Sequence, residues 1–202
     1  MKLYYAPGAC SLAPHIVLRE TGTQFALERV DLGKHQLSSG ADYYAINPKG
    51  GVPTLELDNG ERLTEGAIVA QYVADRAGNT QLLPAAGTMQ RYRVLEWQNY
   101  ITSELHKAFS PLFGAPALDD AGKGAFAQGL QKKFGWVSEQ LKGKQYLTGD
   151  HYTVADAYMF VVAGWAKHVK LDLSQASHLQ AYLARIAERP AVREAMRAEG
   201  LI

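Results

Sequence analysis

One stretch decides how this chain of 202 residues is interpreted: Asn47-Pro48-Lys49-Gly50-Gly51-Val52-Pro53-Thr54-Leu55. Pro53 has no backbone N–H, so it suits the first residue of a strand or a sheet edge, and it holds Val52 extended. The N–H and C=O of Val52 are then available to a group outside the sheet. Two interpretations stay open for this stretch alone: an ordinary turn rich in proline and glycine, or a loop that presents its main chain to an extended, peptide-like ligand.

Strand and helix patterns alternate on both sides of this loop, over residues 1–78. A strand, a crossover helix and a second strand make a βαβ unit, and Asn59-Gly60 predicts a two-residue hairpin. The expected elements are a strand at Leu3–Tyr5, a helix at Ala9–Thr21 with Ser11 as its cap, a strand at Phe25–Asp31, a helical piece at Asp42–Ile46, strands at Thr54–Leu57 and Arg62–Thr64, and a helix at Glu65–Gly78. This order predicts an α/β domain of the thioredoxin-like type.

The rest of the chain carries only helical patterns. Residues 79–88 are predicted to be a linker, and residues 89–202 an all-α C-terminal domain. The expected helices are Met89–Phe109, Ala125–Leu141, Thr153–Trp165, Leu179–Ala187 and Ala191–Glu199, with a loop at Pro116–Gly124. Thr153 and Asp156 form a capping-box pattern, and loss of Asp156 as a cap is expected to cost on the order of 1 kcal/mol.

Cys10 is the single cysteine of the chain, so no internal disulfide can form and any thiol chemistry falls to this residue. It follows the first predicted strand at the start of the first helix, where backbone N–H groups and the helix dipole favour an anion. A thiol in such a place can have its pKa lowered from about 8.5 to roughly 3.5–7.5. The alternative is a buried, inert cysteine. Ala13 stands where the second cysteine of a CxxC pair would be, which disfavours a dithiol oxidoreductase.

Glu65 and Gly66 open the third predicted helix. Glu65 could be no more than an acidic residue favoured in the first turn. It could also accept the ammonium group of a ligand while the Gly66 N–H donates to the carboxylate of that ligand. An α-amino acid end at this helix start, an extended partner for Val52 and a sulfur near Cys10 together describe glutathione.

Composition narrows the classes of partner and compartment. The formal net charge is +1 at pH 7, which gives no reason to expect nucleic acid or an anionic membrane surface. The N-terminus has no apolar core of signal-peptide length, no segment is apolar for long enough to span a bilayer, and the six histidines are scattered. We therefore expect a soluble, cytoplasmic protein that binds no metal, no nucleic acid and no membrane.

Seven segments, spread from one end of the chain to the other, point to a single family. They are Tyr4-Tyr5-Ala6-Pro7-Gly8-Ala9-Cys10-Ser11-Leu12-Ala13-Pro14-His15, Asn47-Pro48-Lys49-Gly50-Gly51-Val52-Pro53, Leu63-Thr64-Glu65-Gly66, Ser103-Glu104-Leu105-His106-Lys107, Ser110-Pro111-Leu112-Phe113, Gly149-Asp150-His151-Tyr152-Thr153-Val154-Ala155-Asp156-Ala157-Tyr158 and Ala198-Glu199-Gly200-Leu201-Ile202. Together they resemble the bacterial beta-class glutathione transferases. The resemblance implies that family's fold, a thioredoxin-like domain followed by a helical domain, with glutathione as co-substrate.

The resemblance also assigns residues of the first domain to glutathione. It implies a cis Val52–Pro53 peptide bond, with the Val52 main chain pairing with the cysteinyl residue of glutathione. Glu65 and Gly66 would hold the γ-glutamyl end, and Cys10 with Ser11 as a supporting donor would lie at the sulfur.

This chain departs from the family pattern at two of its predicted binding positions. Many relatives in the wider superfamily have serine at the position of Gly66, and that hydroxyl is missing here. His35 stands where beta-class members commonly carry a lysine toward the glycyl carboxylate, and the resemblance leaves open whether His35 or Lys34 makes that contact.

The resemblance assigns part of the helix Met89–Phe109 to the site as well. Without it, polar residues at these spacings would indicate a solvated helix face. With it, His106 and Lys107 would reach the sulfur region, while the preceding residues would contact glutathione or the second subunit of a homodimer. Glu104 would reach the γ-glutamyl amine bound by that subunit. The assigned residues are Asn99, Ser103, Glu104, Leu105, His106 and Lys107.

The implied activity is conjugation of reduced glutathione to hydrophobic electrophiles. Cys10 and His106 are the expected catalytic residues, for redox turnover, with Ser11 and Lys107 as supporting donors. Cys10 is also expected to form a mixed disulfide with glutathione, which gives thiol-transferase or peroxidase-like activity. Two alternatives remain: a glutaredoxin-like reductase that removes glutathione from disulfides, and a non-enzymatic carrier of hydrophobic ligands. The electrophile is not indicated, and Tyr5, Phe109, Phe113 and Trp165 are candidates equally for substrate walls and for the core.

Overall fold

The computed structural model describes residues 1–114 and 118–202, and the chain forms two compact units. One unit consists of Met1–Leu83 together with Glu188–Ile202, and the other of Pro84–Ala187. The last helix therefore packs with the N-terminal unit, although it follows the helical unit in sequence and we expected it there. The predicted division into a domain of residues 1–78, a linker of residues 79–88 and a domain of residues 89–202 stays a prediction.

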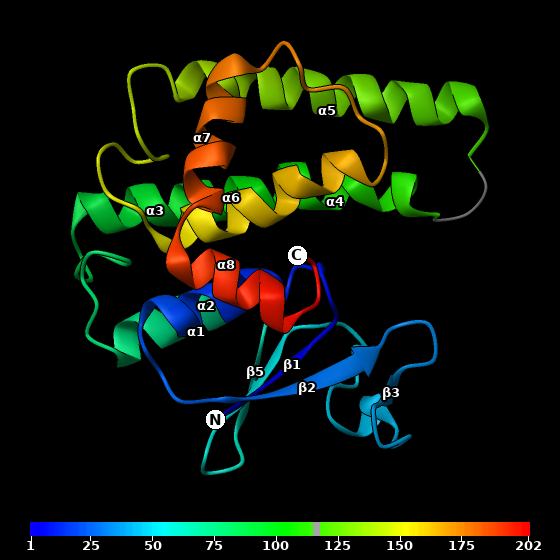
Figure 1. Cartoon of the computed structure of the whole chain (residues 1–202), viewed down its shortest axis with the longest axis vertical. Coiled ribbons are helices and arrows are strands. Elements are labelled where there is room, and N and C mark those ends of the chain that lie inside the picture. The colour runs from blue at the N-terminus through cyan, green and yellow to red at the C-terminus, as the bar shows by residue number, and fades with distance from the viewer. Residues whose placement is uncertain (115–117) are drawn as a thin grey trace. The chain divides into compact units, whose positions relative to one another are not determined.

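The N-terminal unit is built on a five-stranded sheet with three helices gathered on one side of it (Figure 1). Its elements are β1 (Lys2–Tyr5), α1 (Leu12–Glu20), β2 (Ala26–Asp31), β3 (Gln36–Leu37), a 3-10 turn (Tyr43–Ala45), β4 (Thr54–Glu56), β5 (Arg62–Thr64), α2 (Gly66–Arg76) and α8 (Pro190–Ala198). The strand order is β3-β2-β1-β4-β5. β1 and β2 are parallel and joined by α1, which confirms the predicted βαβ unit. β4 and β5 form the predicted antiparallel hairpin, but its turn is longer than the two residues predicted: the Leu57 N–H donates to Glu61 O at 2.8 Å, which leaves Asp58, Asn59 and Gly60 in the turn.

Local sequence explains how these elements meet. Leu3 of β1 faces Leu55 of β4 across the antiparallel ladder, and both side chains are fully buried. Burial of one such side chain is worth about 1.5–3 kcal/mol. Gly60 closes the β4–β5 turn with a φ of +84°, which glycine adopts without steric cost because it has no Cβ. The short strand β3 was not predicted, because its two residues lie in a polar stretch with no alternation to detect.

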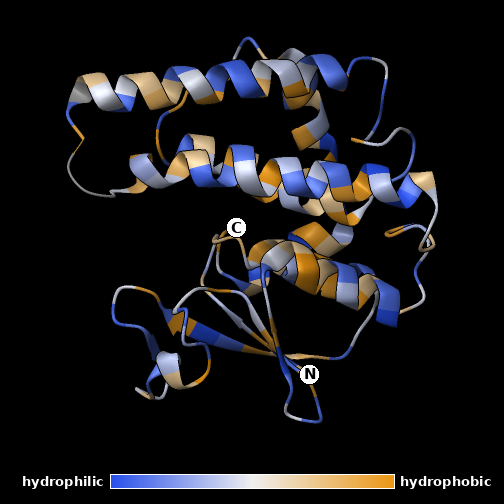
Figure 2. Cartoon of the chain, turned by 180° about the vertical axis from the view of Figure 1, so that it is seen from behind, coloured by the Kyte–Doolittle hydropathy of each residue, from blue (hydrophilic) through white to orange (hydrophobic). Residues whose placement is uncertain are grey.

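The helical unit contains the remaining helices, along which hydrophobic and hydrophilic residues alternate, most visibly on α3 and α5 (Figure 2). Its elements are α3 (Met89–Tyr100), a π-helical segment (Ile101–His106), α4 (Lys107–Phe109), a 3-10 turn (Ser110–Phe113), α5 (Asp120–Gln140), α6 (Val154–Gly164), a second 3-10 turn (Trp165–Lys167) and α7 (Ser177–Ala187). Within the described residues, no helix is long and apolar enough to cross a membrane.

Two predicted boundaries in this unit were wrong. The helix expected from Ala125 begins at Asp120, because the side chain of Asp119 caps it by accepting the Gly122 N–H at 2.8 Å. The predicted loop Pro116–Gly124 is therefore shorter at its C-terminal end, and its first residues, Pro116 and Ala117, lie outside the described residues.

The helix expected over Met89–Phe109 is not a continuous α-helix, since Ile101–His106 is wound as a π-helix. Two hydroxyls mark its start: Thr102 Oγ1 donates to Gln98 O at 2.8 Å, and Ser103 Oγ donates to Asn99 O at 3.0 Å. Hydroxyls that bond to the carbonyl four residues back loosen the regular helical ladder. Insertions of this kind are frequent at functional sites, and this one ends at His106.

Candidate active site

The loop that contains Val52 and Pro53 is held by hydrogen bonds from Tyr43 and Asn47. Its Val52–Pro53 peptide is cis, as predicted. Tyr43, which is fully buried, donates its hydroxyl to Gly51 O at 2.9 Å, and Asn47 Nδ2 donates to the same oxygen at 2.7 Å. Burial raises the pKa of Tyr43, which keeps its hydroxyl a donor. Val52 itself stays half-buried. Sequence reasoning singled out the loop but missed Tyr43 as its support.

Cys10 and Val52 are in contact. The sequence predicts that Cys10 lies at the sulfur of glutathione and that the Val52 main chain pairs with its cysteinyl residue. The Cys10 thiol is partly exposed, and its Sγ donates to Val52 O at 3.1 Å. A carbonyl that accepts the thiol hydrogen stabilises the protonated form of the sulfur. The same carbonyl is one of the two groups that an extended peptide would use at this position.

Ser11 does not cap α1, contrary to our expectation. Its hydroxyl is fully buried, donates to Ala6 O at 3.2 Å and accepts the Ala6 N–H at 3.2 Å, and no capping bond from the side chain is formed. The hydroxyl therefore ties the turn before Cys10 to the end of β1, and the whole of Ser11, main chain included, is buried.

The turn before Cys10 is also fixed from the far end of the chain. The Gly8 N–H donates to Glu199 Oε2 at 2.9 Å, and Glu199 Oε1 lies 2.8 Å from His15 Nδ1, with both side chains fully buried. Sequence reasoning missed this contact, because 184 residues separate the two side chains. The one signal in the sequence that this end of the chain matters was the resemblance of Ala198–Ile202 to the family.

Glu65 combines an uncommon backbone with an ammonium partner. Its φ of +68° lies in a region that residues other than glycine seldom adopt, and such residues cluster at ligand sites. Its carboxylate pairs with Lys49 Nζ, which also donates to Thr64 Oγ1 at 2.7 Å. We predicted that Glu65 would accept the amine of a ligand, and that contact stays a prediction, because the partner of the carboxylate here is Lys49. Gly66 begins α2 directly after it.

His35 lies against the same loop. Its Nδ1 is 3.2 Å from Gly50 O, and its ring is 4.6 Å from the ring of Tyr44. Gly50 is required here, because its φ is +70° and a Cβ would lie 2.7 Å from Tyr44 Cε1. Lys34 is exposed, and its backbone N–H bonds to Asp31 Oδ1 at 3.1 Å. Of the two candidates for the glycyl carboxylate, His35 is the one in contact with the loop.

In the helical unit, His106 sits in an aromatic cluster. Its Nδ1 is 2.6 Å from the Tyr158 hydroxyl, and its ring is 4.8 Å from the ring of Trp165. Phe109 and Phe113 pack against Trp165 at ring distances of 5.6 and 5.5 Å. Phe109 is fully buried, whereas Phe113 is 51% exposed, so Phe113 is the open side of this cluster.

The other residues predicted on this helix divide by exposure. Asn99, Ser103, Glu104 and Lys107 are exposed, whereas the side chain of Leu105 is fully buried in the core of the unit. The predicted contact of Leu105 with glutathione is therefore not supported, because the whole residue is buried. Glu104 pairs with Lys133 of α5 at 2.8 Å. No partner for Glu104 on α5 was foreseen from the sequence.

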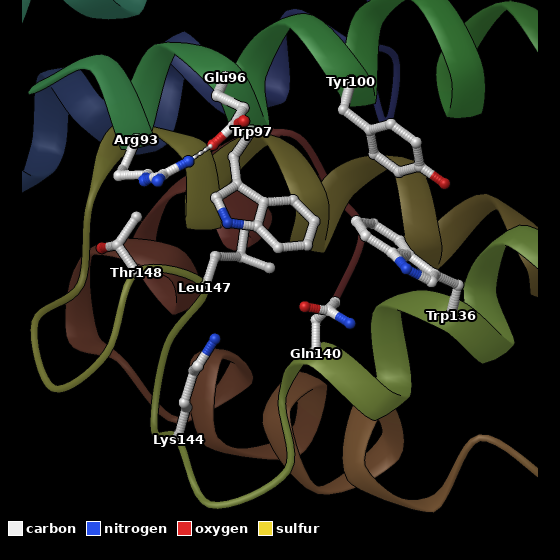
Figure 3. Close-up of a pocket in the computed structure, with 9 residues that line it drawn as sticks. All are labelled: Arg93, Glu96, Trp97, Tyr100, Trp136, Gln140, Lys144, Leu147 and Thr148. Atoms are coloured by element: carbon white, nitrogen blue, oxygen red, sulfur yellow. Dashed lines mark hydrogen bonds and ion pairs between the residues drawn. The ribbon is translucent and has the colours of Figure 1, made fainter. Parts of the chain in front are cut away.

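A cavity of about 560 Å³ opens in the helical unit between α3, the end of α5 and the loop that follows α5 (Figure 3). The rings of Trp97, Tyr100 and Trp136 line it, 5.0 to 6.1 Å from one another, and the Lys144 side chain points toward it. None of the predicted site residues lines this cavity. Among the described residues, no cluster of three or more potential metal ligands occurs.

Comparisons with known proteins agree with this geometry. Residues 8–76 match the glutathione S-transferase N-terminal domain and residues 101–190 the C-terminal domain. Glutathione S-transferase GstA of Escherichia coli O157:H7 is 50% identical over the full length of both chains. Two solved structures cover all of this chain and all of their own: the ternary complex of BphK, a bacterial transferase (53% identity, TM-score 0.96), and the beta-class enzyme of Sphingomonas chungbukensis (44%, 0.95).

The fold and these matches define a glutathione-dependent transferase, and the chain belongs to the glutathione S-transferase family. Within that family it is a bacterial beta-class enzyme, as the resemblance of its motifs predicted.

Proposed function

We propose that this enzyme binds reduced glutathione along the loop Asn47–Leu55 and directs its thiolate at hydrophobic electrophiles. The observation that carries the proposal is the contact of Cys10 Sγ with Val52 O at the cis Val52–Pro53 peptide. It puts a thiol beside a backbone group that an extended cysteinyl residue can pair with. Glu65 and Gly66 would receive the γ-glutamyl end, and His35 the glycyl carboxylate.

The reaction asks mainly for positioning and for stabilisation of an anion. Glutathione supplies the nucleophilic sulfur, and donors fixed in advance lower the free energy of its thiolate and of the charge that develops during attack. The proposed donors are the Cys10 backbone near the start of α1 and, from the helical unit, His106 and Lys107. The partly open aromatic cluster of Phe113 and Trp165 suits an apolar electrophile.

Cys10 adds a second reaction, exchange with a glutathione disulfide. Its thiolate attacks one sulfur of the disulfide, a new Cys10–glutathione disulfide forms, and the other thiol leaves with the bonding electrons. A second glutathione then attacks that mixed disulfide and releases oxidised glutathione. The cysteinyl N–H of bound glutathione would donate to the same Val52 O and compete with the thiol for this acceptor.

We propose further that the enzyme acts as a homodimer in the cytoplasm, where a single, partly exposed thiol stays reduced. Glu104, exposed beside Lys133, would reach the glutathione amine of the other subunit. The two alternatives make different demands. A glutaredoxin-like reductase would turn over disulfides and no electrophile. A non-enzymatic carrier would bind apolar compounds without glutathione, and the cavity at Trp97 and Trp136 is the feature that favours it.

The missing hydroxyl at Gly66 allows the glutathione site to be tested by a gain of affinity. A Cβ at Gly66 would lie 3.6 Å from Pro53 Cδ and 3.7 Å from Cys10 O, which is ordinary van der Waals contact. Gly66→Ser is therefore expected to fold normally and to add one hydrogen bond to the γ-glutamyl carboxylate. Such a bond is worth about 1 kcal/mol, so calorimetric titration should show roughly fivefold tighter binding of reduced glutathione.

Gly66→Ala is the matched control, because it adds the same Cβ without the hydroxyl. Both variants should gain stability by about 0.4–1 kcal/mol from the loss of backbone freedom in the unfolded chain. Affinity should rise in Gly66→Ser alone. Equal affinities in the two variants, or weaker binding in Gly66→Ser, would place the glutathione carboxylate away from α2. A wild-type chain that binds no glutathione would refute the proposed function itself.

A further inference from the structure

The aromatic cluster of the helical unit contains a hydroxyl that bears directly on His106. Tyr158 lies on α6, is 4% exposed, and places its hydroxyl oxygen 2.6 Å from His106 Nδ1. The ring of Trp165 lies against the imidazole at 4.8 Å and 77°. The hydrogen bond and the ring contact together fix the orientation of the imidazole within the helical unit.

The short distance favours the hydroxyl as the donor. Hydrogen bonds from a hydroxyl to an oxygen are commonly 2.5–3.0 Å long, whereas those donated by a ring or backbone N–H centre on about 2.9–3.0 Å, and the separation here is 2.6 Å. A buried phenol is a good donor and requires an acceptor. Neutral imidazole offers one nitrogen as acceptor and the other as donor. The geometry therefore suits a Tyr158 O–H that donates to a bare His106 Nδ1.

We propose that Tyr158 is a positioning residue that sets the tautomer of His106, so that neutral His106 carries its hydrogen on Nε2. In this tautomer Nε2 is an N–H donor, and it is directed by the ring orientation that Tyr158 and Trp165 impose. A neutral donor can stabilise a thiolate at a pH where the imidazole is not protonated. The inference deepens the proposed function, because it rests on His106 acting at the glutathione sulfur.

The proton positions are measurable without any substrate. Nitrogen-15 NMR of the histidine side chains, with the His106 signals assigned by their loss in His106→Gln, distinguishes a protonated ring nitrogen from a bare one. We expect the hydrogen of the neutral His106 ring to be on Nε2 in the wild-type protein, at a pH where the imidazole carries one proton only. In Tyr158→Phe, which keeps the ring and removes the hydroxyl, we expect both tautomers to be populated.

Kinetics give the second readout. Tyr158→Phe is expected to lower kcat for glutathione-dependent conjugation about tenfold and to leave the KM for glutathione unchanged, because the substrate still binds while the donor is misdirected. Tyr182→Phe is the matched control. Tyr182 is also buried in the helical unit and donates its hydroxyl at 2.9 Å, but to Asp156 instead of His106. That variant should lose stability and keep both the tautomer and kcat.

The inference would be overturned by wild-type His106 with its hydrogen on Nδ1, or by the same Nε2–H tautomer in Tyr158→Phe as in the wild type. A shift of tautomer in Tyr182→Phe would overturn it too, since the effect would then be a general loss of packing. A protein with the expected tautomers but without glutathione-dependent turnover would refute the proposed function and leave the hydrogen-bond assignment standing.

Discussion

Replacing Cys10 with alanine is expected to slow reduction of a glutathione mixed disulfide by at least about 100-fold, because no second thiol in the chain can take over as nucleophile. Conjugation of glutathione to an aromatic halide should stay within several-fold of the wild type. In that reaction the attacking sulfur belongs to glutathione, and Cys10 is only a neighbour. Steady-state rates of both reactions, measured on the same preparations, separate the two roles.

Cys10→Ser is the matched control for this prediction. It keeps a group that can donate to Val52 O in place of the thiol, which donates at 3.1 Å in the wild type, and it removes the sulfur. The serine variant should therefore bind glutathione like the wild type and lose disulfide reduction as fully as Cys10→Ala. Undiminished disulfide reduction in both variants would show that bound glutathione alone attacks the disulfide, and Cys10 would then have no redox role.

Replacing Asp156 with alanine is expected to lower the free energy of unfolding by about 3–5 kcal/mol, well above the cost of one lost helix cap. The carboxylate is fully buried and accepts four donors: Thr153 N and Oγ1 at 2.8 Å each, Leu147 N at 2.9 Å and Tyr182 Oη at 2.9 Å. Each buried donor left unpaired costs about 1–3 kcal/mol. Urea unfolding of the two proteins measures the difference.

Asp119→Ala is the control for position, since Asp119 caps α5 from an exposed site with one bond, to the Gly122 N–H at 2.8 Å. It should cost about 1 kcal/mol, the usual value for a lost cap. Similar losses for the two variants would mean that Asp156 acts as a cap and no more. Burial raises the pKa of Asp156 above its usual value, and the four bonds to its oxygens oppose that rise.

Only part of the environment of Asp156 could be predicted from the sequence. The pattern Thr153–Asp156 predicted the capping box, which is present, because a cap depends on residues three apart. The remaining partners, Leu147 and Tyr182, come from the preceding loop and from α7. No local pattern reveals that they converge on one carboxylate, so the loss expected from the sequence is smaller than the loss expected from the structure.

In the candidate active site too, some features could be predicted from the sequence and others could not. The βαβ unit, the cis Val52–Pro53 peptide and a place for Cys10 near Val52 were expected from local patterns and from the family motifs, whereas β3, and with it the full strand order, was not. The role of Ser11 was not, because its hydroxyl turns back to Ala6 and leaves α1 without a side-chain cap. The π-helical turn that ends at His106 was also missed, since an amphipathic pattern of this length does not distinguish α from π winding.

The proposed nucleophile of this transferase is glutathione bound at the Val52 loop. The most direct measurement is the rate at which the purified wild-type enzyme conjugates reduced glutathione to 1-chloro-2,4-dinitrobenzene, with reduction of a glutathione mixed disulfide assayed in parallel. We predict turnover in both assays, saturable in glutathione and dependent on the enzyme. Binding of apolar compounds without glutathione-dependent turnover in either assay would contradict the account.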